Sequence, residues 1–402
     1  MTTDTTIHDA ILAVNAGSSS LKFALYPQNG TEIAVARLSG NMEGLEHGGT
    51  PLVKISGRDG NSTEVLHPGE GTPHERALEA LGSVLDRHAK GIRITAVAHR
   101  IVHGGDRFSE SVLLDDDTVT YLESLSSLAP LHQPHNIAGV RAFRKSFPDL
   151  PQIGCFDTAF HATLPEKERT FALPKSLRDE GIRRYGFHGL SYRYVTDRLL
   201  ARSPRARERM VIAHLGNGAS ACAIRDGKSI ATTMGFSALD GLMMGTRSGA
   251  IDPGVLLHLL RQGWTWEQLE RTLYRESGLR GVSGVSADMR TLLASGERDA
   301  ALAIQMFTHR LVRECGALSA CLEGLDVLAF TGGIGEHDVS LRDNACKSLA
   351  YLGVRIDAEK NRAATGDTIS AIHVDGSPVE VWVVPTDEGR VAAQDAARLI
   401  AS

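Results

Sequence analysis

Apolar residues in the first part of the chain occur in short runs separated by polar, glycine-rich turns. Residues 11–26 form two apolar runs joined by a turn that holds Gly17 and three serines, which predicts a strand, a tight turn and a returning strand. Asn29-Gly30 predicts a hairpin turn into a further strand over residues 31–38. Residues 40–72 are polar and glycine-rich, so we expect loops and edge strands there.

Helical spacing of apolar residues begins further along the chain. We expect, in order, a helix over 73–90, a buried strand over 94–102, a helix over 117–129, a break at 131–136, a helix over 137–146 and a short strand over 151–156 that ends at Asp157.

The second half repeats this logic. A buried strand over 210–215, a small-residue turn over 216–220 and a strand over 221–225 mirror the opening stretch, which indicates an internal duplication into two α/β halves. Ligands of such folds usually lie in the cleft between the halves. We further expect helices over 254–275 and 298–323, strands over 327–330 and 379–384, a glycine-rich turn over 331–336, and a closing helix to Ile400.

The first glycine-rich turn has the composition of a phosphate cradle. Gly17 lets the backbone approach a ligand, small serines leave amide groups uncovered, and Lys22 adds a positive charge. An ordinary tight hairpin remains the alternative, since glycine and serine are common in turns. Two further glycine-rich strand ends, at 214–218 and 332–336, suggest a nucleotide held by backbone from both halves.

Two standard nucleotide motifs are rejected. Residues 216–221 fit the G-x-G-x-x-[GA] pattern, but that motif requires a helix after it and a strand is predicted here. Gly227-Lys228-Ser229 resembles the end of a Walker loop, but Cys222 stands where that loop needs a glycine.

Composition bounds the class of protein. The 402 residues suggest two or three domains, and a net charge of −5 favours neither nucleic acid nor an anionic membrane as partner. The first ten residues lack the basic start and apolar core of a signal peptide, and no apolar run is long enough for a membrane helix. Five dispersed cysteines fit a reducing cytoplasm better than a disulfide framework or a zinc site.

Several charged residues stand at strand ends or in glycine-rich loops. Arg100 and Arg247 have the setting of anion-binding guanidinium groups, although most arginines are solvated surface charges. His188 lies in an aromatic, glycine-rich loop, where a structural role is the alternative. Asp157 and Glu388 each follow a strand and have the oxygen ligands that Mg²⁺ prefers.

These residues belong to motifs that resemble those of the acetate kinase family. The matching stretches are Asn15-Ala16-Gly17-Ser18-Ser19-Ser20-Leu21-Lys22, Ala98-His99-Arg100-Ile101-Val102-His103-Gly104-Gly105, Phe156-Asp157-Thr158-Ala159-Phe160-His161, Arg184-Tyr185-Gly186-Phe187-His188-Gly189, His214-Leu215-Gly216-Asn217-Gly218 and Gly332-Gly333-Ile334-Gly335-Glu336. The resemblance covers about residues 11 to 398.

The resemblance implies the duplicated actin-like (ribonuclease-H-like) α/β fold shared by acetate and sugar kinases, heat-shock chaperone ATPases and actin. It implies two domains with ATP in a central cleft, residues 1–156 with 386–402 and residues 157–385. It also implies a cytoplasmic homodimer that reversibly transfers the γ-phosphoryl group of ATP to acetate, with Mg²⁺ or Mn²⁺ as cofactor.

The resemblance also assigns roles. Asn15 and Glu388 match metal positions, Lys22 matches an ATP-phosphate contact and Arg100 matches the substrate-carboxylate contact. Asp157, His188 and Arg247 match catalytic positions, and Val102, Leu131 and Phe187 match the acetyl pocket. The nucleotide-binding positions are matched by His214, Leu215, Gly216, Asn217, Gly218, Asp288, Met289, Arg290, Gly332, Gly333, Ile334, Gly335 and Glu336.

The chain departs from the family pattern at seven positions, which are Leu190, Tyr192, Ala238, Ala250, His337, Asp387 and Gly389. Ala238 replaces the proline of the acetyl pocket, which leaves the preference between acetate and propionate open. A propionate or other short-chain acid kinase is therefore the first alternative. An ATPase switch of the same fold, which would need no carboxylate-binding Arg100, is the second. A catalytically silent homologue is the third.

Overall fold

The structure is a computed structural model, and it describes residues 8–17, 19–45, 49–57, 60–66 and 71–401. Contacts divide the chain into two compact units: unit 1 comprises Met1–Ala159 with Asp387–Ser402, and unit 2 comprises Phe160–Thr386. The domain limits and the cleft expected from the sequence stay predictions. No helix in the described ranges combines the length and the apolar character that a membrane span requires.

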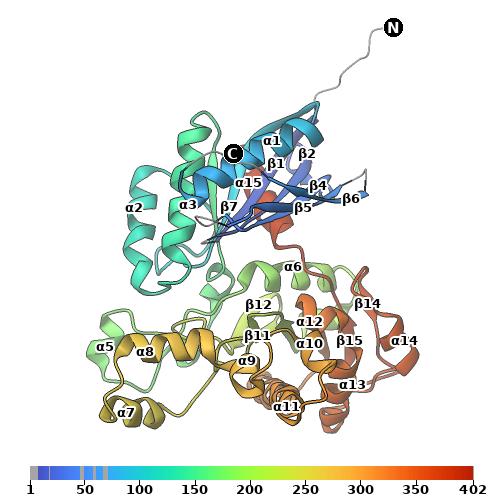
Figure 1. Ribbon diagram of the computed structural model, residues 1–402. Helices are drawn as coiled ribbons and strands as arrows, with labels where there is room; N and C mark the ends of the chain where they lie inside the picture. Colours follow the sequence, from blue (N-terminus) through green and yellow to red (C-terminus); the bar gives the residue numbers. More distant parts are fainter. Residues whose placement is uncertain (1–7, 18, 46–48, 58–59, 67–70, 402) are drawn as a thin grey trace. The chain divides into compact units, whose positions relative to one another are not determined.

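Unit 1 contains one sheet and four α-helices in its described residues (Figure 1). Its elements are β1 (His8–Ala16), β2 (Leu21–Asn29), β3 (Glu32–Ile33), β4 (Leu38–Glu43), β5 (Leu52–Gly57), β6 (Gly60–Val65), α1 (Pro73–His88), β7 (Ile92–Ile101), β8 (Val112–Leu113), α2 (Asp116–Ser124), the 3₁₀ turn η1 (Leu125–Ser127), α3 (Gln133–Ser146), β9 (Gln152–Phe156) and α15 (Glu388–Ala401).

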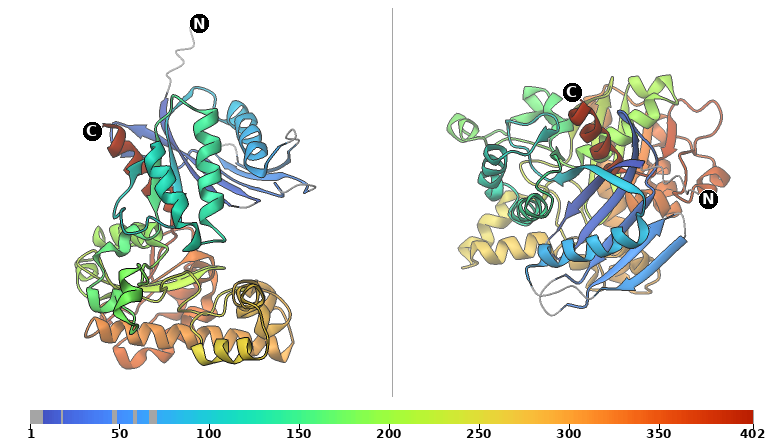
Figure 2. Two further views of the ribbon diagram at one scale, coloured as in Figure 1. Left: turned by 90° about the vertical axis from the view of Figure 1, so that its left-hand side faces the viewer. Right: turned by 90° about the horizontal axis from the view of Figure 1, so that it is seen from above.

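Alternation along β1 places its residues on two different faces of this sheet. Leu12, Val14 and Ala16 pack into a core with residues of α1 and α3, including Phe143. Ala13 points to the opposite face, where α15 lies (Figures 1 and 2). The strand order is β6-β5-β4-β2-β1-β7-β9-β8, with β1, β7 and β9 parallel.

Unit 2 carries a second sheet and a larger set of helices. Its elements are η2 (Ala159–Thr163), α4 (Glu166–Arg169), α5 (Lys175–Asp179), α6 (Gly189–Leu200), η3 (Pro204–Arg207), β10 (Met210–Leu215), β11 (Ala219–Arg225), β12 (Lys228–Thr232), α7 (Pro253–Arg261), α8 (Trp266–Arg271), η4 (Thr272–Glu276), α9 (Gly278–Ser283), α10 (Met289–Leu293), α11 (Arg298–Cys321), β13 (Val327–Thr331), α12 (Gly332–His337), α13 (Val339–Ser348), η5 (Ala350–Leu352), α14 (Ala358–Ala363), β14 (Ser370–Ala371) and β15 (Glu380–Val383).

The two sheets confirm the internal duplication. The order β12-β11-β10-β13-β15-β14 repeats β4-β2-β1-β7-β9-β8 strand for strand. Across each sheet, two antiparallel strands lie beside three parallel strands, and a short antiparallel strand pairs with the outer parallel strand at the edge. The predicted strand after the 216–218 turn is present as β11, which confirms the rejection of a Rossmann site.

The structure corrects four local predictions. The helix expected over 254–275 is interrupted after α7, where Gly263 has φ +90°. Residues 332–336 belong to α12 rather than to a turn, and α3 begins at Gln133, because Pro134 is compatible with the first helical turn. Of the strand expected over 31–38, only β3 and the first residue of β4 are in strands.

Candidate active site

The carboxyl ends of the three parallel strands of unit 1 carry three of the predicted site residues. Asn15 is the penultimate residue of β1, Arg100 is the penultimate residue of β7, and Asp157 directly follows β9. Register brings the strands into line here, since Arg100 is paired with Cys155 of β9. The carboxyl edge of parallel strands is where α/β folds usually bind ligands.

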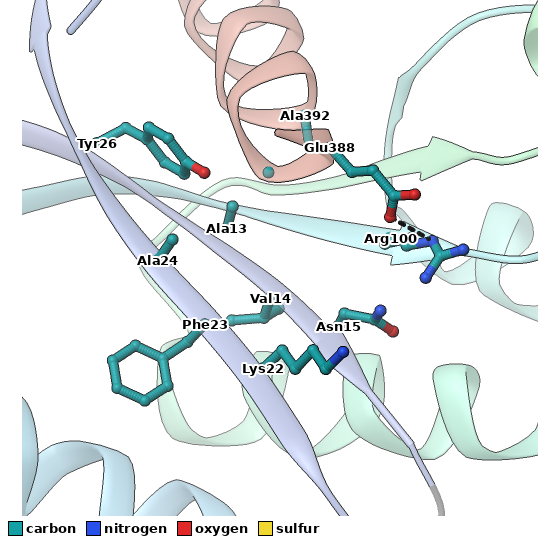
Figure 3. Close-up of a pocket in the computed structure, with 11 residues that line it drawn as sticks. Ala13, Val14, Asn15, Lys22, Phe23, Ala24, Tyr26, Arg100, Glu388 and Ala392 are labelled. Atoms are coloured by element: carbon teal, nitrogen blue, oxygen red, sulfur yellow. Dashed lines mark ion pairs between the residues drawn. The ribbon is translucent and has the colours of Figure 1, made fainter. Parts of the chain in front are cut away.

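Lys22 joins this edge from the antiparallel neighbour β2. It is the cross-strand partner of Asn15, and both side chains project from the face that α15 covers (Figure 3). A cavity of about 160 Å³ opens between this face and α15. Its lining residues are Ala13, Val14, Asn15, Lys22, Phe23, Ala24, Tyr26, Arg100, Glu388, Gly389 and Ala392.

Arg100 is the centre of an ion-pair cluster. Its Nε and Nη2 donate to the two carboxylate oxygens of Asp157 at 2.9 and 2.7 Å, and Nε lies 3.4 Å from Glu388 Oε2. Burial acts to lower the pKa of the guanidinium, but the charges of Asp157 and Glu388 raise it above its usual value. Asp157 is buried, whereas a quarter of the Arg100 side chain is exposed. The two carboxylates therefore hold the Arg100 guanidinium in its charged form at the cavity.

Two amides on α3 fix the loops that follow β1 and β7. Asn136 accepts from the Val102 backbone N–H at 3.0 Å and donates to the Ala16 carbonyl at 2.8 Å. Gln133 accepts from the His103 N–H and donates to the His103 carbonyl. Val102 lies in the loop after β7 and is half-buried. Leu131 lies in the turn before α3 and does not line the cavity.

Glu388 is presented by the first turn of α15, not by a strand end. Asp387 caps the helix by accepting from the Arg390 N–H at 3.0 Å, and it also accepts from the Tyr26 hydroxyl at 2.5 Å. A carboxylate in the first turn is stabilised by the helix dipole. A methyl group at Gly389 would lie 2.5 Å from the Tyr26 oxygen, which accounts for glycine at this position.

His188 directly precedes α6 and has a left-handed backbone, with φ 61°. Its ring stacks on that of His214 with 4.3 Å between the ring centroids, and its Nδ1 lies 2.8 Å from Ser220 Oγ. The preceding Phe187 is buried, and its carbonyl accepts from His161 Nε2 at 2.9 Å. Left-handed conformations of non-glycine residues concentrate at functional sites.

Arg247 lies near the same point of unit 2. A methyl group at Gly218 would be 3.4 Å from His188 Nε2 and 3.8 Å from Arg247 Nη1, so both side chains border the 216–218 turn. Arg247 Nη1 donates to the Ala238 carbonyl at 3.2 Å, and burial lowers the pKa of its guanidinium. The backbone carbonyl of Asn217 accepts a hydrogen bond from the Gly245 N–H, and this bond ties the Arg247 loop to the turn.

Two predicted nucleotide loops are neighbours, because β10 and β13 are parallel and pair His214 with Thr331. Gly332 has φ +76°, and a methyl group there would lie 2.8 Å from the Leu215 carbonyl. Glu336 accepts from the Gly332 N–H at 2.8 Å and from the Thr386 N–H at 3.1 Å. Leu215 is the last residue of β10, and Gly216, Asn217 and Gly218 form the turn after it. Gly333, Ile334 and Gly335 lie in α12.

The third predicted nucleotide segment lies at the start of α10. Asp288 caps this helix, Met289 is buried, and the exposed Arg290 forms an ion pair with Asp288 at 2.7 Å. The side-chain hydrogen bond from Arg290 lowers the pKa of Asp288 to about 2. This arrangement is a local helix start, and nothing further in it indicates a nucleotide.

Comparisons with known proteins show the family of the chain. The family model described as the acetokinase family matches residues 10–394. The chain belongs to the acetokinase family. An acetate kinase of Rhodopseudomonas palustris is 48% identical over 396 residues, covering 97% of this chain and 98% of that protein.

A propionate kinase of Yersinia enterocolitica is 42% identical, covering 98% of this chain and 96% of that protein. The crystal structure of Porphyromonas gingivalis acetate kinase matches with a TM-score of 0.87 and 37% identity, over 98% of this chain and all of that one. The actin-like fold predicted from the motifs is therefore confirmed for this member of the acetokinase family.

Sequence reasoning missed the residues that hold the acetokinase motifs in place. Asn136 and Gln133 lie in a polar stretch whose sequence predicts a break in the chain. Ser220 closes the 216–220 turn, and its small hydroxyl carries no signal of a contact with His188. Ser18 of the first glycine-rich turn lies outside the described residues.

Proposed function

We propose that this protein reversibly transfers the γ-phosphoryl group of ATP to acetate, giving acetyl phosphate and ADP. The observation that carries the proposal is the cluster of Lys22, Arg100, Asn15 and Glu388 around one cavity at the carboxyl ends of parallel strands. Family membership supports the same chemistry.

Acetate needs no general base, because a carboxylic acid with a pKa near ~4 is ionised at neutral pH. The difficulty is to bring a carboxylate to an anionic phosphate. In the proposal, Arg100 binds the carboxylate. Arg100 contacts Asp157 and Glu388 through Nε and Nη2, so the substrate would be bound at the Nη1 edge. Val102, Leu131 and Phe187 would surround the methyl group.

Metal binding fits the donor set. The Asn15 amide and the Glu388 carboxylate line the same cavity, and such oxygen ligands suit Mg²⁺ or Mn²⁺. Within the described residues no group of three or more histidine, cysteine or acidic side chains is arranged to hold a metal ion. Mg²⁺ is commonly held by only one or two carboxylates together with water and substrate phosphates. When bound, it neutralises phosphate charge, and Asp157 would orient the water around it.

Transfer itself is a displacement at phosphorus. An acetate oxygen bonds to the γ-phosphorus, the bond to the bridging oxygen breaks, and ADP leaves with that electron pair. Lys22 would neutralise phosphate charge, and Arg247 and His188 would donate to the equatorial oxygens of the transition state. Such charge stabilisation is the main protein contribution to phosphoryl transfer. The loops at 214–218, 288–290 and 332–336 would bind the nucleotide.

The test is a hydroxylamine-trapped acyl-phosphate assay with ATP, Mg²⁺ and acetate, propionate or butyrate. The proposal expects acyl hydroxamate with acetate as the preferred acid and its loss in Arg100→Ala. A higher kcat/KM for propionate would favour the alternative that the propionate kinase relatives suggest. ATP hydrolysis without any acyl phosphate would contradict transfer and favour an ATPase switch.

We also propose a cytoplasmic homodimer. None of the five cysteines, all of which lie in the described ranges, forms a disulfide, and this suits a reducing compartment. Unit 2 exposes large apolar side chains on and near α7, α8 and α11, and such residues commonly become buried between subunits. They are Ile251, Val255, Leu257, Leu260, Trp266, Leu302 and Met306. Light scattering of the full chain should give twice the monomer mass, and Leu257→Asp should reduce that mass.

A further inference from the structure

A chain of buried hydroxyl groups leads from the interior of unit 2 to His188. Tyr192 lies four residues after His188, so it occupies the same side of α6 one turn later. Its hydroxyl forms a short hydrogen bond with Ser220 Oγ, and Ser220 Oγ lies 2.8 Å from His188 Nδ1. Tyr192 and Ser220 are both fully buried. Their protons therefore have to be accounted for without solvent.

The direction of the two hydrogen bonds follows from counting donors. Burial raises the pKa of Tyr192, so its phenol is neutral and has one O–H to donate. Among the described residues, Ser220 Oγ is the recorded partner of that hydroxyl. If the phenol donates to Ser220, the Ser220 hydroxyl donates onward to His188 Nδ1, because accepting a second bond from an Nδ1–H would leave the buried Ser220 proton unpaired. The opposite order would leave the buried phenol proton unpaired, which is unfavourable.

An accepting Nδ1 places the proton of neutral His188 on Nε2. That nitrogen faces the 216–218 turn, since a methyl group at Gly218 would lie 3.4 Å from it and 3.8 Å from Arg247 Nη1. Both donors thus border the same space, where the phosphoryl oxygens are proposed to bind. We propose that Tyr192 is a positioning residue that acts through Ser220 to hold His188 as the Nε2–H tautomer, with this proton directed at the transferring phosphoryl group.

Two further side chains of unit 2 lie beside the His188 ring. His214 stacks on the ring and is itself bonded through Nδ1 to Ser191, and Arg247 contributes positive charge near Nε2. The inference about Tyr192 rests on the proposed catalytic role of His188, but the tautomer can be measured independently of that role.

The first experiment measures the tautomer in the full-length protein without substrates. Selective ¹⁵N-histidine labelling and long-range ¹H–¹⁵N correlation distinguish protonated from unprotonated ring nitrogens, and His188→Asn identifies the signal among the 16 histidines. The wild type should show an unprotonated Nδ1 and a protonated Nε2. Tyr192→Phe should shift His188 towards a mixture of tautomers. A protonated Nδ1 in the wild type would overturn the proposal.

Tyr194→Phe is the matched control. Tyr194 lies on the same helix, and its ring centroid is 4.9 Å from Arg198 Cζ. Because it is two residues after Tyr192, it lies on a different side of the helix from the hydroxyl chain. Its variant removes one phenolic oxygen from α6 and should leave the His188 signals unchanged. Equal effects of Tyr192→Phe and Tyr194→Phe would contradict the proposal.

The second experiment is kinetic. Tyr192→Phe should lower kcat by about five- to tenfold, the factor associated with one ordinary hydrogen bond, with the KM values for acetate and ATP unchanged. Because the two hydroxyls act in series, Tyr192→Phe combined with Ser220→Ala should be no slower than Ser220→Ala alone. Additive losses, or a change confined to KM, would overturn the positioning role. A wild type that forms no acyl phosphate would refute the proposed function, and the tautomer measurement would still decide the hydroxyl chain.

Discussion

At the scale of single residues, His188 combines features that a purely structural histidine would not need. A left-handed backbone costs a non-glycine residue about 1–3 kcal/mol. The stacking on His214 and the hydrogen bond to Ser220 offset this cost and orient the ring. Sequence reasoning selected His188 from its glycine-rich loop and its family motif, but neither reveals a backbone angle or a buried hydroxyl partner.

Replacing Arg247 with alanine tests the transition-state role. The guanidinium is proposed to bind oxygens that gain charge during transfer, so kcat should fall by about 10³-fold or more while the KM for ATP changes little. Steady-state kinetics with varied ATP and acetate measure both. Arg207→Ala is the control, because Arg207 is a largely exposed arginine of the same unit and should be dispensable. A loss confined to KM would remove the proposed role.

Ala238 tests the selectivity for acid length. It replaces a bulkier proline in the pattern of the family, and its carbonyl accepts from Arg247. We expect Ala238→Pro to lower the ratio of kcat/KM for propionate to that for acetate. One methylene is worth about 1–3 kcal/mol in such pockets, so the change should be graded. An unchanged ratio would show that Ala238 does not border the acyl group.

At the scale of elements, packing at the start of α15 explains why residue 389 is a glycine, although the family pattern has a glutamate there. Tyr26 on β2 reaches across to Asp387, and the space that it fills excludes any side chain at residue 389. This contact between β2 and the start of α15 sets the position of Glu388, which lies in the same helical turn. Gly389 therefore reflects a local compensation for Tyr26 and not a weakened helix start.

Gly389→Ala should destabilise unit 1 by about 1–3 kcal/mol, the usual cost of overpacking. The new methyl group would lie 2.5 Å from the Tyr26 oxygen but 3.2 Å from the nearest ring carbons. Combining it with Tyr26→Phe should therefore be less harmful than the sum of the two changes. Denaturant unfolding of all four proteins measures this coupling, and strict additivity would contradict the contact.

Sequence patterns predicted the type of most elements but not all their limits. Buried strands such as β10 and long helices such as α1 were found, because their apolar periodicity is strong. The break at Gly263 and the helical start at Gln133 were missed, since glycine within a helical pattern and a proline beside polar residues each permit two outcomes. Tertiary packing selects between them.

At the scale of the whole molecule, each unit contains a fully buried neutral histidine. His99 in unit 1 donates to Gln152, and His161 in unit 2 donates to the Phe187 carbonyl. Burial lowers the pKa of each to about 4. The unfolded chain, in which the pKa is near ~6.5, therefore binds these protons first as the pH falls.

Stability should accordingly decrease as the pH falls from about 6.5 towards 4, by up to about 3 kcal/mol for each histidine. His99→Gln and His161→Gln should each flatten the dependence of the free energy of unfolding on pH, measured by denaturant titration at several pH values. Exposed His309 offers a control in His309→Gln, which should leave the slope unchanged. A wild-type stability that is constant over this range would contradict the prediction.

The sequence by itself determined the duplicated α/β architecture, the family and the set of charged residues at strand ends. Apolar periodicity and glycine-rich turns are local properties that a one-dimensional pattern records. Only the tertiary structure decided which side chains hold the site in position. The bonds from Asn136 to Ala16, from Tyr26 to Asp387 and from Tyr192 to Ser220 join different elements, and each depends on packing that no local pattern encodes.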